Sequence, residues 1–223
     1  ILEGNLDDAI INVNTDSVLD FDGVNDYITV ADHNSLDFGV GADFSFSAWI
    51  KLNTTENDFY MIFDKGSDTT RYSFLIYNND KLTIHIHESF SSSLTVTDTS
   101  WHHVGVSVDR SGNATFYLDG ATDTVDVSGK NGNNLTNTDA LIIGGKYDAS
   151  DHYFDGIIAD ARIYDTILSD AADWDKLASK MFVVVGSPVA WWKINEGTGT
   201  AIDNIAEAGV DGTATNFAMT GTS

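Results

Sequence analysis

Oxygen-bearing side chains in loops are the first groups in this sequence that could do chemistry. Asp20, Asp22, Asn25 and Asp26 lie close together, and three more aspartates lie within residues 148–155. Calcium prefers several hard oxygen ligands that converge from loops. Neither group has the spacing of an EF-hand. The sequence therefore predicts a loop-borne calcium site, with a merely solvated acidic surface as the alternative.

Aromatic and histidine side chains suggest a second chemistry. Sugar sites use an aromatic face flanked by polar groups, because stacking and hydrogen bonds together desolvate one face of a sugar. The candidates are Trp49, Tyr77, His85, His87, Tyr147 and Tyr153. Each aromatic residue could instead belong to the core. His85 and His87 are two residues apart on one strand, so they could chelate a transition metal, contact a ligand or simply face solvent.

Short strands must position these groups. Residues 43–52 alternate clearly, with Phe44, Phe46 and Ile50 on one face and Trp49 on the other. Similar alternation recurs every 8–12 residues between turn signals such as Asp-Gly and Asn-Gly, which is typical of a β-sandwich. A helix is predicted only near 169–180, with Ser169 as its N-cap.

The stretch at 153–168 predicts a central strand, because both of its faces carry apolar residues from Ile157 to Tyr164. Asp160 and Arg162 lie two residues apart on one face of it. They could form a structural ion pair, or Asp160 could be a metal ligand or another site residue. The pattern alone leaves both interpretations open.

Charge and composition exclude several classes of partner. The chain has 223 residues, with 11 Lys and Arg against 34 Asp and Glu, which gives a net charge of −23. Such a chain is unsuited to neutralising phosphates, so nucleic acid and anionic membranes are excluded as partners. No apolar run is long enough to span a membrane, so no membrane insertion is expected. The absence of cysteine excludes disulfides and thiolate metal sites.

Five motifs together resemble a known family. They are LDFDGVNDYITV, DFSFSAWIK, SWHHVGVSVDRSGNATFYLDG, LIIGG and FDGIIADARIYDTILSD, in this order. In order and spacing they resemble laminin-G-like jelly-roll domains of the concanavalin A-like lectin/glucanase superfamily, over about residues 18–174. The resemblance implies an all-β, two-sheet antiparallel jelly-roll sandwich that binds glycans, often with calcium. It also implies that Asp160 can complete a calcium site with Asp20, Asp22, Asn25 and Asp26.

The resemblance divides the chain into three parts. Residues 1–16 are expected to be a linker or edge segment, and 17–181 the sandwich. Residues 182–223 resemble a segment that normally precedes the first motif. They are therefore expected to complete the sandwich or to pair with a neighbouring subunit. The chain does not begin with Met, and we interpret it as a piece of a longer protein.

Catalysis is not expected. The glucanase branch of the superfamily uses two glutamates spaced as ExDxxE, and the five glutamates of this chain are isolated. We therefore expect a non-catalytic carbohydrate-binding or adhesion module, stabilised by calcium, of an extracellular, cell-surface or virion-surface protein. Its partners would be glycans or other subunits of a surface assembly. The alternative is a structural protein, such as a phage capsid decoration or tail-fibre domain or a surface-layer repeat, in which the sandwich is a scaffold.

Overall fold

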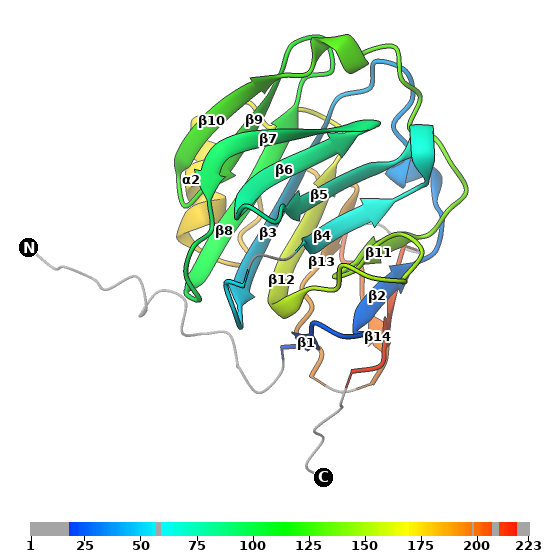
Figure 1. Ribbon diagram of the computed structural model, residues 1–223, viewed down its shortest axis with the longest axis vertical. Coiled ribbons are helices and arrows are strands. Elements are labelled where there is room, and N and C mark those ends of the chain that lie inside the picture. Colours follow the sequence, from blue (N-terminus) through cyan, green and yellow to red (C-terminus); the bar gives the residue numbers. More distant parts are fainter. Residues whose placement is uncertain (1–17, 57–58, 198, 207–209, 218–223) are drawn as a thin grey trace, which may run out of the picture.

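Two antiparallel sheets packed face to face make up the protein (Figure 1). The computed structural model describes residues 18–56, 59–197, 199–206 and 210–217. The sheets, with one α-helix beside them, confirm the predicted jelly-roll sandwich. Residues 1–16, predicted as a linker or edge segment, lie outside the described residues.

The first sheet has seven strands in the order β1-β12-β3-β8-β9-β10, and β13 also pairs with β12. Its strands are β1 (Asp20–Asp22), β12 (Asp155–Tyr164), β3 (Phe44–Leu52), β8 (Trp101–Val108), β9 (Asn113–Leu118), β10 (Ala121–Asp126) and β13 (Ala190–Trp192). Strand β12 is a central strand, paired with β3 along one edge and with β1 and β13 along the other.

The second sheet has eight strands in the order β14-β15-β2-β11-β4-β5-β6-β7. They are β14 (Ala201–Ile202), β15 (Gly212–Thr215), β2 (Tyr27–Val30), β11 (Leu141–Ile143), β4 (Tyr60–Lys65), β5 (Tyr72–Ile76), β6 (Lys81–Ile86) and β7 (Glu88–Thr95). The four strands β4 to β7 are sequential neighbours and face the viewer in Figure 1.

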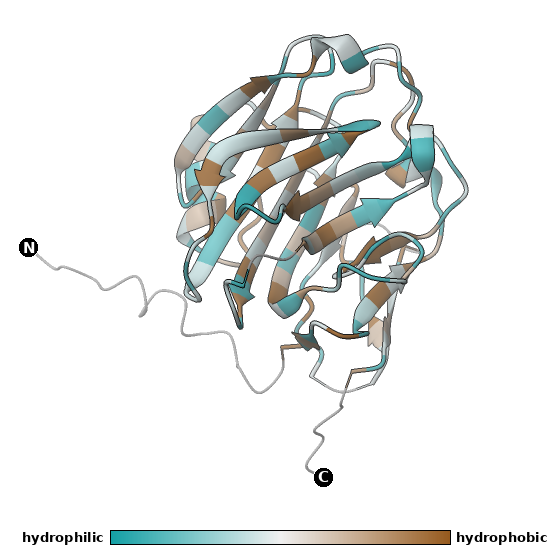
Figure 2. Ribbon diagram, viewed as in Figure 1, coloured by the Kyte–Doolittle hydropathy of each residue, from teal (hydrophilic) through white to brown (hydrophobic). Residues whose placement is uncertain are grey.

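The core lies between the two sheets and follows from the period-two pattern of the strands. Phe44, Phe46 and Ile50 of β3 are fully buried there, opposite residues such as Phe74 and Ile84 of the second sheet. Hydrophobic and hydrophilic residues alternate visibly along β6 (Figure 2). Alternate side chains of each strand therefore point away from the core, and these outward faces are where a site can form.

The C-terminal strands pair within the chain's own sheets. Strand β13 adds to β12 in the first sheet, and β15 adds to β2 in the second. The indole of Trp192 is fully buried and donates a hydrogen bond to the carbonyl of Val210 at 2.9 Å, which ties these segments together. The described part of residues 182–223 thus extends both layers of one sandwich.

Helix α2 (Ala171–Ser179) packs on the outer face of the first sheet. Its N-cap is Asp170, which accepts a hydrogen bond from the Ala172 amide, so the prediction of Ser169 was off by one residue. Trp174 packs face to face with Tyr117 at 3.8 Å between ring centroids. The ring also lies against Gly105, where a Cβ atom would come within 2.2 Å of it.

Asp160 and Arg162 form a buried ion pair on the same outer face. The Asp160 carboxylate accepts hydrogen bonds from Arg162 at 2.8 Å, from the Trp191 indole at 2.6 Å and from the Phe182 amide at 2.9 Å. A bulge in β12 and a left-handed backbone at Asp160 (φ 53°) aim the carboxylate at these donors. The pair therefore holds the C-terminal segment against β12. This agrees with the interpretation of Asp160 and Arg162 as a structural ion pair.

Removing the Asp160 carboxylate should destabilise the fold strongly. Asp160→Ala leaves the Arg162 charge buried without its partner, which costs about 3–5 kcal/mol. Urea unfolding monitored by tryptophan fluorescence measures the loss. Asp165→Ala, at an exposed position one residue beyond β12, is the control and should change the free energy of unfolding by less than about 0.5 kcal/mol. Equal effects of the two substitutions would contradict the role given to Asp160.

Candidate functional site

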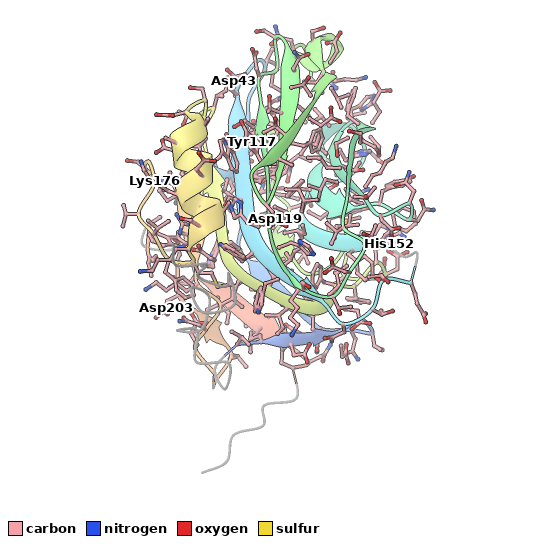
Figure 3. All side chains as sticks on the ribbon, turned by 90° about the vertical axis from the view of Figure 1, so that its left-hand side faces the viewer. Asp43, Tyr117, Asp119, His152, Lys176 and Asp203 are labelled. Atoms are coloured by element: carbon pink, nitrogen blue, oxygen red, sulfur yellow. The ribbon has the colours of Figure 1, made fainter. Side chains whose placement is uncertain are left out.

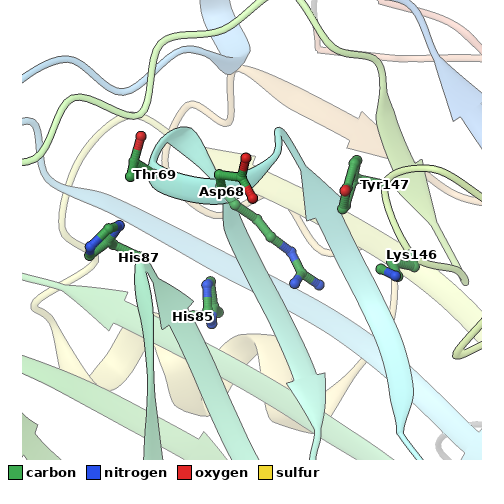
Figure 4. A pocket seen from close by; sticks show the side chains of 7 residues that line it. Asp68, Thr69, His85, His87, Lys146 and Tyr147 are labelled. Atoms are coloured by element: carbon green, nitrogen blue, oxygen red, sulfur yellow. The ribbon is translucent and has the colours of Figure 1, made fainter.

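A groove on the outer face of the second sheet is the candidate site. It consists of two hollows of about 440 and 180 Å³ that share Arg71, His85 and Lys146. The larger is also lined by Asp68, Thr69, His87 and Tyr147, and the smaller by Phe59, Met61, Ser73, Leu75, Tyr77, Ser89 and His152. Figure 4 shows Lys146 and Tyr147 across the larger hollow from His87. In Figure 3, His152 lies on the opposite side of the molecule from α2.

Strand register brings the polar residues of the groove into one row. Asp64 of β4 is directly opposite Ser73 of β5, Ser73 is opposite His85 of β6, and His85 is opposite Ser89 of β7. Directly paired residues on neighbouring strands point to the same face of a sheet. The pairing alone therefore sets a line of hydrogen-bonding groups across four strands.

The floor of the groove is buried although it faces away from the core. Met61 and Leu75 are a directly paired couple, each 3% exposed, and Ser73 is fully buried. Among the residues that the structure describes, the Ser73 hydroxyl oxygen has no hydrogen-bond partner. An unsatisfied buried hydroxyl is costly. Ser73 is therefore an unsatisfied polar group at the bottom of the smaller hollow.

A buried carboxylate holds one wall of the groove in place. Asp64 accepts two hydrogen bonds from Arg71, at 2.8 and 2.7 Å, and a third from the Tyr147 amide at 3.0 Å. Burial works against the charge of Arg71, but the Asp64 hydrogen bonds and charge outweigh it and raise the pKa of the guanidinium. The planar fork of Arg71 is thereby fixed and stays charged.

His85 is a neutral hydrogen-bonding group at the centre of the groove. Burial, with smaller contributions from Arg71 and His87, lowers its pKa from 6.5 to about 4. One ring nitrogen, Nδ1, lies 3.1 Å from the Ser89 hydroxyl. At neutral pH the ring therefore carries one donor and one acceptor, a combination suited to the hydroxyl groups of a sugar.

Most of the predicted sugar-contact residues line this groove. Tyr77, His85, His87 and Tyr147 all do so, although they come from three separate segments of the chain. Trp49 does not. It is 4% exposed, and its indole donates a hydrogen bond to the Leu177 carbonyl beneath α2. The prediction of Trp49 as a sugar platform is therefore wrong, because the helix covers the face on which it lies.

The five predicted calcium ligands do not form one set. Asp22 accepts hydrogen bonds from the Val24 and Asn25 amides in its own turn, and the Asp160 carboxylate is occupied by Arg162 and its other donors. Asp20 accepts from the Asn53 side chain, and Asp26 from the Asp22 amide. Among the described residues, no three histidine, aspartate or glutamate side chains are grouped to hold a metal ion. The predicted set therefore does not fit a calcium ion, and calcium binding stays a prediction.

Comparison with known proteins supports the fold. A family model described as the concanavalin A-like lectin/glucanases superfamily matches residues 22–172. The chain belongs to this superfamily. A Bacteroides ovatus protein assigned as carbohydrate-binding has a similar structure, with a TM-score of 0.69 and 16% identity over 90% of this chain and 59% of its own. A heptameric SAP-like pentraxin from Limulus polyphemus follows with a TM-score of 0.52 and 15% identity, over 87% of this chain and 97% of its own.

One sequence relative is an adhesion receptor. Adhesion G-protein coupled receptor V1 of Danio rerio is 25% identical over 139 residues, which is 57% of this chain. This member of the superfamily spans only 2% of that receptor and 59% of the Bacteroides ovatus chain. These likenesses establish the fold of the domain, and the groove must be judged on its own residues.

Sequence reasoning missed the cations of the groove and the acid that orders them. Arg71 and Lys146 lie outside any alternating pattern, at a strand entry and in a loop. Asp64 follows the apolar run from Phe59 to Phe63, which has hydrophobic residues on both faces. This run was the signal in the sequence for a covered outward face around Asp64, because apolar residues on both faces of a strand indicate that both faces are covered.

Acid should weaken the fold through His85. The unfolded chain binds a proton on this residue below about pH 6.5, whereas the folded protein does so only near pH 4. Stability from this group is therefore complete above pH 6.5 and falls as the pH drops towards 4. His85→Gln should show a shallower fall in unfolding free energy between pH 7 and 5 than the wild type. An unchanged pH dependence in His85→Gln would contradict this interpretation.

Proposed function

We propose that this domain binds carbohydrate, with the groove over β4 to β7 as its glycan site. The observation that carries the proposal is the row of polar groups from Asp64 to Ser89 beside the half-buried rings of Tyr77 and Tyr147. Hydroxyl, imidazole and guanidinium groups satisfy sugar hydroxyls, and aromatic surfaces cover the apolar faces of sugar rings. The structural resemblance to the Bacteroides ovatus protein assigned as carbohydrate-binding supports this proposal.

Binding suits the groove better than hydrolysis. Glycoside hydrolysis ordinarily needs two carboxyl groups on either side of the scissile bond. Among the described residues, Asp68 is the single acid that lines the larger hollow, and none lines the smaller. Asp64 is occupied beneath the groove by Arg71 and the Tyr147 amide.

We place the domain in an extracellular or surface protein of greater length. The laminin-G type of domain and the adhesion-receptor relative support this placement. Within the described residues, no helix is both long and apolar enough to cross a membrane. The net charge of −23 argues for glycans or protein subunits as partners rather than nucleic acid.

Binding on a glycan array should depend on the groove. Tyr77→Ala and His85→Ala should each weaken the strongest glycan signal by about tenfold, because each removes contact surface or a hydrogen bond worth roughly 1.4 kcal/mol. His102→Ala, a half-buried histidine on the first sheet, is the matched control and should leave binding unchanged. Silence of the folded protein across all glycans would instead favour the scaffold alternative.

A further inference from the structure

A lysine is buried on the core side of the second sheet. Lys65 is the last residue of β4, and it is the one fully buried lysine in the described part of the chain. It is directly paired with Tyr72 of β5 and Leu141 of β11, which are both core residues, so its side chain points into the sandwich. Lysine is rarely found in such a position unless its ammonium group is paired.

Two carboxylates and one amide surround the ammonium group of Lys65. Its Nζ atom lies 2.9 Å from Asp32 Oδ1 and 3.0 Å from Asp37 Oδ1. It also lies 3.0 Å from the backbone oxygen of Asn137 and 3.0 Å from the side-chain oxygen Oδ1 of the same residue. Because Oδ1 is bonded to the amide carbon Cγ, this carbon too is close to the lysine nitrogen.

The amide of Asn137 is held firmly in this position. Its Nδ2 atom donates to two backbone carbonyl groups, at 3.0 and 3.2 Å, and its Oδ1 atom accepts from the Asp139 amide at 3.0 Å. Gly66 leaves room for it, since a Cβ atom there would come within 2.5 Å of Nδ2. The backbone amide of Asn137 also donates to Asp37 Oδ1, at 3.2 Å. An amine, an amide and a carboxylate are thus fixed side by side, which favours an intramolecular reaction.

We propose that Lys65 and Asn137 join their side chains in an isopeptide bond. The ammonium group passes one proton to the Asp37 carboxylate, which acts as the base, and the electron pair thereby freed on Nζ attacks Cγ of Asn137. The Asp139 amide stabilises the negative charge that develops on Oδ1. The bond between Cγ and Nδ2 then breaks. Nδ2 takes a second proton from Nζ, leaves as ammonia and carries off the proton of Asp37 as an ammonium ion.

The surroundings favour each part of this step. A buried ion pair is costly to keep out of water, and the proton transfer to Asp37 removes two opposite charges at once. Water has no access to the fully buried lysine, so it does not compete with the amine. The new bond joins β4 to a position 72 residues later, just before β11, in a chain that has no cysteine for a disulfide. The inference is independent of the proposed glycan site.

Intact-mass spectrometry of the denatured 223-residue chain tests the proposal. The chain should be lighter than its sequence mass by one molecule of ammonia. Trypsin should then fail to cleave after Lys65, because an amide nitrogen carries no charge, and a branched peptide should contain both Lys65 and Asn137. A chain of full sequence mass that yields linear peptides at both positions would overturn the proposal and leave Lys65 as a buried ion pair.

Matched substitutions at the two carboxylates test the part given to Asp37. Asp37→Asn removes the base and should keep the chain at its full sequence mass, whereas Asp32→Asn should still lose ammonia, because Asp37 remains. An undiminished loss of ammonia in Asp37→Asn would overturn the step as written. Circular dichroism checks that both variants are folded, and the mass of the unsubstituted chain decides the proposal in either case.

One further substitution excludes a different source of the mass change. An asparagine can also release ammonia by closing an imide with its own backbone, without any lysine. Lys65→Met removes the attacking amine and should therefore restore the full sequence mass. A loss of ammonia that persists in Lys65→Met would overturn the proposal.

Discussion

The buried carboxylate of Asp64 is the constraint on which the candidate site depends. It lies on the outward face of β4, where a charge without partners would be prohibitively costly. Arg71 and the backbone of Tyr147 supply the partners, and so a strand entry and a distant loop are both drawn to the same point. The groove exists because these segments meet there. The same interaction fixes the position of Arg71, which lines both hollows.

Asp160 is the corresponding buried aspartate on the first sheet, but the segment that it holds covers part of the outward face there. It too is a buried aspartate on an outward face, with an arginine two residues away. Its remaining donors come from Trp191 and Phe182, which belong to the C-terminal segment. That segment and α2 cover part of the first sheet, where a hollow of about 380 Å³ remains beside Ser107 and Tyr117. The second sheet keeps its outward face open over β4 to β7, where the two hollows of the groove lie.

The sequence pattern predicted the layers well because alternation is a local property. Phe44 and Phe46 mark their strand without any knowledge of its partners, and the family motifs then order the strands. Trp49 was misplaced because its burial depends on a helix about 120 residues later, which no local pattern reveals. Arg71 and Lys146 were missed for the same reason, since their proximity is created by sheet register and by Asp64. Tyr77, His85, His87 and Tyr147 could be placed on an outward surface because outward polar and aromatic residues are visible in strands and loops. Their contact with a ligand stays a prediction.

The central claim is that ligand binds over β4 to β7 and not elsewhere. Amide chemical-shift mapping of the isotope-labelled domain, titrated with the tightest-binding glycan from the array, tests this most directly. The account predicts that the largest shifts fall on Ser73, His85 and Tyr147, with the amides of α2 unmoved. Shifts concentrated on α2 and the first sheet, with the groove unchanged, would contradict it.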